Sequence, residues 1–177
     1  MNIDFSVSND ILSTSINTVN LTAVNTILQG YTSTVVNVTS AEMKFGITLT
    51  PSDSGKIHVF SEQISEGGAI QLPTPVGNPG LKYIFRSNVN MPFVGVLIHI
   101  NIEKGLNLLY GSLIDLSSGS PNTKNILPES PRNAIRIKPG TDVGGMYIVL
   151  ESDGVMYHVN GHVVQIEPNL PCSFVLA

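Results

Sequence analysis

Histidine is the first candidate for chemistry in this chain, because it can bind metals and move protons near neutral pH. The chain has four histidines: His58, His99, His158 and His162. Only the last two are close in sequence. Asn160-Gly161 between them is a strong signal for a two-residue hairpin turn, and across such a turn His158 and His162 would point to opposite faces. A zinc site needs three or four converging ligands, so we predict strand histidines and no metal site.

A nucleophilic site would need a serine or cysteine beside a histidine with an orienting acid. The single cysteine, Cys172, lies in a predicted apolar strand, where a buried structural thiol is the commoner case. No Gly-x-Ser-x-Gly motif occurs. The segment 53–56, Asp-Ser-Gly-Lys, superficially resembles the end of a phosphate loop, but it lacks the first glycine and precedes a predicted strand. We interpret it as a turn.

A glycoside hydrolase would need two carboxylates facing one cleft. The candidates are Asp53, Glu62, Glu66, Asp115, Glu129, Asp142, Glu151 and Asp153. Most lie in predicted turns, and sequence alone brings no two of them together. We therefore predict no catalytic residues, no cofactor and no enzyme, and a hydrolase remains the least favoured hypothesis.

Sugar binding by a β-sandwich usually involves exposed aromatic rings. The chain has no tryptophan, and 6% of its residues are aromatic. The tyrosines considered for this role are Tyr31, Tyr110, Tyr147 and Tyr157. The last two could face inward as easily as outward, which weakens a lectin-like interpretation but leaves it open.

Low charge distinguishes the composition: 12% of the residues are charged, against about 25% in typical soluble domains. Asparagine, serine and threonine supply most of the other polar groups. A surface of this kind loses water more cheaply than one of lysine and glutamate, so it suits lasting contact with other proteins. A secreted β domain with a neutral polar surface is the alternative.

Several partners are disfavoured. The net charge is −4 and lysine and arginine form no cluster, so no nucleic-acid footprint is expected. No apolar run approaches the roughly 18 residues of a membrane helix, which argues against membrane insertion. The N-terminus lacks the basic and apolar regions of a signal peptide, so export by the usual route is not expected.

The elements that would position any site are short strands. Residues 48–85 predict turn, strand, turn, short strand, turn and strand, with Pro51-Ser52-Asp53-Ser54-Gly55 as the first turn. In 81–86, alternate residues face opposite sides. Residues 94–102 and 146–150 alternate as well, and 134–138 and 171–176 predict further strands. No convincing helix appears.

Many short strands between Gly/Pro turns are typical of a β-sandwich, a jelly roll or a small barrel. We predict an all-β, antiparallel, jelly-roll-like sandwich. Residues 1–46, rich in Asn, Ser and Thr, form a separate strand or arm region, and residues 47–177 form the sandwich domain. Residues 103–145 hold the longest irregular region.

Two motifs resemble a module of viral and phage virion proteins. The first is Thr-Leu-Thr-x-x-Asp-Ser-Gly-Lys at 48–56, followed by Leu-Pro at 72–73 and Gly-Leu-x-Tyr-x-Phe at 80–85. The second is Ser-Asp-Gly-x-x-Tyr-x-Val-x-Gly at 152–161. The resemblance spans residues 47–161. It implies a β-rich, oligomeric virion component without catalytic residues, and it leaves capsid or tail location open.

The favoured hypothesis is therefore a minor capsid, penton-like or decoration protein of the virion. Its partners would be further copies of itself, as a homo-oligomer, and other capsid proteins. The alternative, from a different class, is a host-attachment or carbohydrate-binding module that contacts a host-surface glycan.

Overall fold

The computed structural model describes residues 34–87, 98–102, 106, 108–116, 124–126, 130–137, 145–163 and 172–175. The chain divides into two compact units, residues 1–32 and 33–177, and every described residue belongs to the second. Statements about strands and sites below concern this described part. The predicted strands within residues 1–33 and the irregular segment 117–123 lie outside it.

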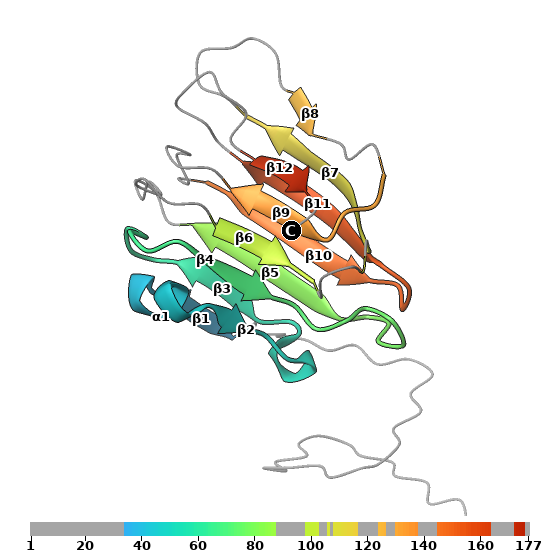
Figure 1. Cartoon of the computed structure of the whole chain (residues 1–177), viewed down its shortest axis with the longest axis horizontal. Coiled ribbons are helices and arrows are strands. Elements are labelled where there is room, and N and C mark those ends of the chain that lie inside the picture. The colour runs from blue at the N-terminus through green and yellow to red at the C-terminus, as the bar shows by residue number, and fades with distance from the viewer. Residues whose placement is uncertain are drawn as a thin grey trace, which may run out of the picture. The chain divides into compact units, whose positions relative to one another are not determined.

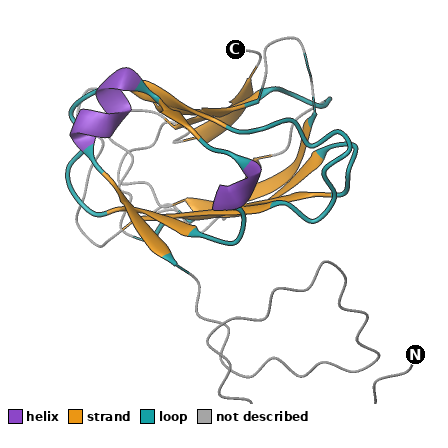
Figure 2. Cartoon of the chain, turned by 90° about the horizontal axis from the view of Figure 1, so that it is seen from below, coloured by secondary structure: helices purple, strands orange, loops and turns teal. Residues whose placement is uncertain are grey.

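Strands form two sheets. Sheet A has seven, in the order β1 (Val35–Val38), β3 (Ile57–Phe60), β5 (Lys82–Ser87), β10 (Tyr147–Ser152), β11 (Tyr157–Val163), β7 (Leu109–Asp115) and β8 (Lys124–Ile126). Sheet B has five, in the order β12 (Cys172–Val175), β9 (Ala134–Ile137), β6 (Ile98–Asn101), β4 (Gly68–Gln71) and β2 (Ile47–Thr48). Figure 1 shows the strands with these labels, and Figure 2 shows them in two layers.

In the first half of the described chain, successive strands alternate between the two sheets. From β1 to β6 each strand lies in the sheet opposite to its predecessor, so β1, β3 and β5 are parallel neighbours, as are β2, β4 and β6. Val35 pairs with Ile57, and Ile57 with Ile84. The turn residues that the sequence places between strands lie in these connections. Each turn therefore leads the chain from one sheet to the other and does not form a hairpin within one sheet.

The parallel pairs confirm the predicted fold class only in part. A β-rich chain is confirmed. The antiparallel prediction holds for half of the strand pairs, because five of the ten described pairs are parallel. Two parallel strands need a crossover connection, and from β1 to β6 this connection includes a strand of the other sheet. The alternation of side chains along a strand does not reveal such a connection.

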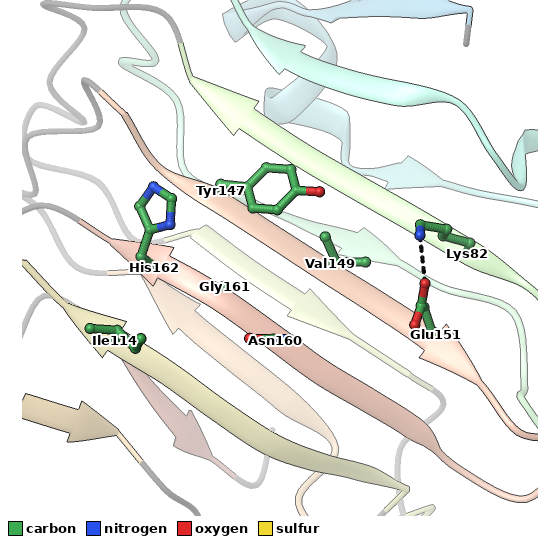
Figure 3. A pocket seen from close by; sticks show the side chains of 8 residues that line it. All are labelled: Lys82, Ile114, Tyr147, Val149, Glu151, Asn160, Gly161 and His162. Carbon is green, nitrogen blue, oxygen red and sulfur yellow. Dashed lines mark ion pairs between the residues drawn. The ribbon is translucent and has the colours of Figure 1, made fainter. Parts of the chain in front are cut away.

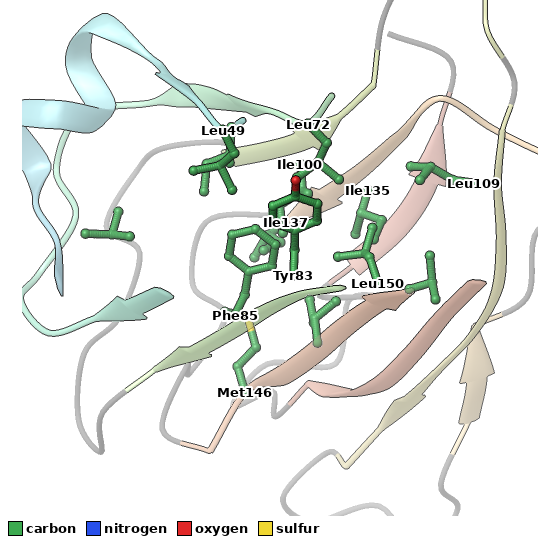
Figure 4. Packing of buried hydrophobic residues seen from close by; sticks show 14 of the residues in the cluster. Leu49, Leu72, Tyr83, Phe85, Ile100, Leu109, Ile135, Ile137, Met146 and Leu150 are labelled. Atoms are coloured by element: carbon green, nitrogen blue, oxygen red, sulfur yellow. The ribbon is translucent and has the colours of Figure 1, made fainter. Parts of the chain in front are cut away.

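Apolar side chains from both sheets meet in one core. Sheet A contributes Tyr83 and Phe85 from β5 and alternate residues of β10, and sheet B contributes Ile100 and Ile135 among others (Figure 4). The alternation predicted for 81–86 and 146–150 is confirmed, with Tyr83, Phe85 and the even-numbered residues of β10 buried. Burial of such side chains supplies the main stabilisation, about 1.5–3 kcal/mol each.

One short helix was not predicted. α1 (Ser40–Phe45) begins at Thr39, whose hydroxyl accepts from the Glu42 amide while the Glu42 carboxylate accepts from the Thr39 amide. This capping box satisfies two amides that would otherwise lack partners. Met43 is fully buried, and Gly68 at the start of β4 has no side chain because a Cβ there would lie 2.0 Å from the Met43 carbonyl oxygen. β1 and α1 thus belong with the sheets, although the sequence assigned them to an N-terminal region ending at 46.

The predicted Asn160-Gly161 hairpin turn is wrong. β11 runs without interruption through both residues and is paired on both sides, with β10 and with β7. The real hairpin joins β10 to β11 through 153–156, where the Asp153 carboxylate accepts from the amides of Val155 and Met156. Two complete ladders outweigh a local preference for a turn, and Gly161 is needed for space, because a Cβ would lie 2.0 Å from the Tyr147 carbonyl oxygen.

Candidate functional site: a trough on sheet A

Four central strands of sheet A present a face directed away from the core. Because side chains alternate along a strand, the partners of the core residues point outward. These outward residues, called the outer face below, are Lys82, Ile84, Arg86, Tyr147, Val149, Glu151, His158, Asn160, His162, Tyr110, Ser112 and Ile114.

Strand register arranges the outer face in three rows across the sheet. The first row is Arg86, Tyr147, His162 and Ile114; the second is Ile84, Val149, Asn160 and Ser112; the third is Lys82, Glu151, His158 and Tyr110. The middle row has shorter side chains than the long or aromatic rows on either side of it. The sheet surface is therefore hollowed along the middle row, and we call this hollow the trough.

The trough has measurable volume. Its central hollow encloses about 530 Å³ and is bounded by Lys82 and Glu151 on one side and by Tyr147 and His162 on the other (Figure 3). Two adjoining hollows extend it, one of about 400 Å³ beside Arg86 and one of about 470 Å³ beside Tyr110. These sizes fall in the range of small-ligand sites, about 300–1,000 Å³.

An aromatic and cationic stack forms the first row. The guanidinium carbon of Arg86 lies 5.0 Å from the centre of the Tyr147 ring, a cation–π distance. The Tyr147 and His162 ring centres are 6.0 Å apart, with an angle of 37° between the rings. In the described part of the chain, the Arg86 guanidinium has neither an ion pair nor a hydrogen bond, so its donors are open to a ligand.

The third row is electrostatically paired. Lys82 Nζ lies 2.5 Å from Glu151 Oε1. His158 Nε2 lies 2.8 Å from Asp153 Oδ2. The hydrogen bond from His158, with those from the Met156 and Val155 amides, holds the pKa of Asp153 well below its usual range. The Lys82–Glu151 pair nearly cancels in charge, so among the described lining residues Arg86 is the cation without an acidic partner.

The histidines lie differently from the prediction. His158 and His162 both belong to the outer face, because an extended strand, not a turn, separates them by four residues. His58 points inward, is 3% exposed, and stacks on Phe85 with ring centres 5.4 Å apart. His58 Nε2 has no hydrogen-bond partner among the described residues, and burial lowers the pKa of this ring. His99 lies in β6, and its side chain is outside the described atoms.

The tyrosines separate into two classes. Tyr157 and Tyr83 are fully buried, and their hydroxyls donate to the carbonyls of Pro73 and Thr50. Tyr110 and Tyr147 lie on the outer face, with Tyr110 46% exposed. Tyr31 lies outside the described residues. The orientation that the sequence left open is thus inward for Tyr157 and outward for Tyr147.

The carboxylates do not form a catalytic pair on the trough, whose described lining holds only Glu151. Asp53 instead caps the 3₁₀ turn η1 (Pro51–Asp53) and binds Lys56 Nζ at 2.7 Å, which lowers the pKa of Asp53 to about 2. This is the turn that the sequence predicts at 51–55. Cys172 begins β12, the predicted final strand. Glu129 and Asp142 lie outside the described residues.

No family model, curated protein or solved structure matches this chain. Among the described residues, no three His, Cys, Asp or Glu side chains gather as a metal site would require. Within the described residues, no helix has the length and apolar character to cross a membrane.

Proposed function

We propose that this protein is a structural component of a virion that assembles with copies of itself and with other capsid proteins. The resemblance of residues 47–161 to virion modules and the low charge support this proposal. The only feature of the fold on which the proposal depends is the presence of two facing sheets. It does not depend on a jelly-roll order of the strands, which stays a prediction.

The observation that carries the proposal is the β1 edge of sheet A. Among the described strands β1 is the outermost, and its residues Val35-Val36-Asn37-Val38 include no charge and no proline. Edge strands of soluble monomers usually carry charged residues or proline, because their unpaired backbone groups would otherwise bind further strands. Val35 is 58% exposed. An edge of this composition suits addition of a strand from another copy of the chain.

Other exposed apolar groups support contact with further partners. Phe45, at the end of α1, is 86% exposed. Val76 and Val155 are exposed on two turns that lie together, joined by a hydrogen bond of 2.9 Å from the Gly77 amide to the Gly154 carbonyl. Phe45 belongs to the helix that directly follows β1, whereas Val76 and Val155 lie on turns far from β1 in the sequence. The two turns therefore offer a surface for contacts of a second kind, to other capsid proteins.

Molar mass measured by light scattering at micromolar concentration tests the proposal. The wild-type protein should form a closed oligomer, and Val35→Lys should shift it toward the monomer. Gln63→Lys makes the same charge change at an exposed loop position and should leave the mass unchanged. A wild-type protein that stays monomeric and binds no capsid partner would refute the proposal.

A further inference from the structure

We infer that the trough binds an acidic saccharide, a sugar of the sialic or uronic acid class, with the carboxylate at Arg86. This inference concerns the outer face alone and does not rest on the assembly proposed through the β1 edge.

The carboxylate position follows from Arg86. The guanidinium carbon of Arg86 lies 5.0 Å from the centre of the Tyr147 ring, and a guanidinium can bind a carboxylate through a bidentate pair of hydrogen bonds. The adjoining hollow of about 400 Å³ is lined by Arg86, Ser87, Gly145, Met146, Tyr147 and His162, so a hydroxyl and an imidazole line the same hollow as the guanidinium. No described carboxylate lines this hollow and competes for Arg86.

Apolar and polar groups alternate along the rest of the trough as they do on a sugar ring. Tyr147 supplies an aromatic ring, and Val149 supplies an apolar floor. The side-chain amide of Asn160 and the Ser112 hydroxyl line the trough and make no hydrogen bond among the described residues, so both can bind ring hydroxyls. Glu151, although paired with Lys82, retains acceptor capacity. Tyr110 at the far end offers a second ring for a longer glycan.

The charge of the lining selects an acidic sugar over a neutral one. Among the described residues Arg86 has no ion-pair partner, in a chain whose net charge is −4. An acidic ligand would therefore gain a charge-assisted hydrogen bond that a neutral sugar lacks, and such bonds are roughly twice as strong as neutral ones.

Isothermal titration of the full chain with sialyllactose, with a glucuronic-acid disaccharide and with lactose tests the inference. We expect both acidic sugars, or one of them, to bind at least about tenfold more tightly than lactose, the factor that one hydrogen bond to a charged group supplies. Arg86→Gln should weaken acidic-sugar binding by at least about tenfold and leave lactose binding unchanged.

Lys44→Gln is the matched control, since it removes one positive charge at an exposed position of α1. It should leave sugar binding intact. Equal weakening by both variants would indicate unspecific attraction and overturn the inference, as would equal affinity for lactose and the acidic sugars. Binding to none of the three sugars at about 10 mM, weaker than the millimolar range of the weakest specific sites, would also overturn it. Thermal unfolding of each variant confirms that it is folded.

Discussion

Two buried phenols should make the protein sensitive to alkaline pH. The Tyr83 and Tyr157 hydroxyls donate to the carbonyls of Thr50 and Pro73 at 2.8 and 3.0 Å. The two rings meet edge to face, with centres 6.1 Å apart. Tyr83 and Tyr157 lie in sheet A, whereas Thr50 and Pro73 follow strands of sheet B. The two hydrogen bonds therefore connect the layers of the fold.

Burial raises the pKa of Tyr83 from 10.0 to about 12 and raises the pKa of Tyr157 as well. The folded state thus favours the neutral phenol. Its contribution to stability is complete below pH 10 and is lost as the pH rises toward the folded pKa. Two pKa units correspond to about 2.7 kcal/mol, of which about 2 kcal/mol is lost by pH 11.5 for Tyr83 alone.

Urea unfolding followed by circular dichroism at about pH 8.5 and pH 11.5 measures this loss, and Tyr83→Phe is the decisive variant. At the lower pH it should be less stable by about 1–3 kcal/mol, because the Thr50 carbonyl loses its donor. Between the two pH values it should lose about 2 kcal/mol less than the wild type.

Tyr110→Phe removes an exposed hydroxyl and controls for the substitution itself. Its pH dependence should follow the wild type. If Tyr83→Phe and the wild type lost the same free energy over this interval, the buried phenol would not be the cause, and the reasoning would fail.

Three further predictions follow from the core and the helix. Burial lowers the pKa of His58, so the fold should lose stability as the pH falls below 6.5, because the unfolded state then binds the proton more tightly. Asp53 raises and Lys56 lowers the pKa of this ring, and both effects are smaller than that of burial. His58→Phe should remove that loss between about pH 7 and pH 5, seen as a constant urea midpoint, and an unchanged slope would contradict the cause. Gly161→Ala should cost several kcal/mol and lower the melting temperature, because its Cβ would overlap the Tyr147 carbonyl; a melting temperature equal to that of the wild type would argue against the close approach. Thr39→Ala should cost about 1 kcal/mol through loss of the helix cap, whereas Thr39→Ser should cost less; equal effects would point to packing instead.

The sequence predicts some features of the trough and not others. Alternation predicts that Lys82, Ile84 and Arg86 share one face of a strand, and the structure shows that this face is directed away from the core. That Arg86 lies beside Tyr147, and Tyr147 beside His162, depends on the register between strands far apart in the chain, which no local pattern reveals. The sequence weakens the carbohydrate-binding alternative because it has no tryptophan and few aromatic residues, and because it does not assign a direction to Tyr147 or Tyr157.

The sequence by itself determined a β-rich chain, the turn at 51–55 and the alternation of residues 81–86 between two faces, since these depend on the backbone preferences and alternation of neighbouring residues. Only the tertiary structure decided that β1 to β6 wind as parallel strands, that Asn160-Gly161 lies within a strand, and that His58 is buried. Each of these results from contacts between distant segments, and the hydrogen bonds of two flanking ladders exceed the preference of one dipeptide for a turn.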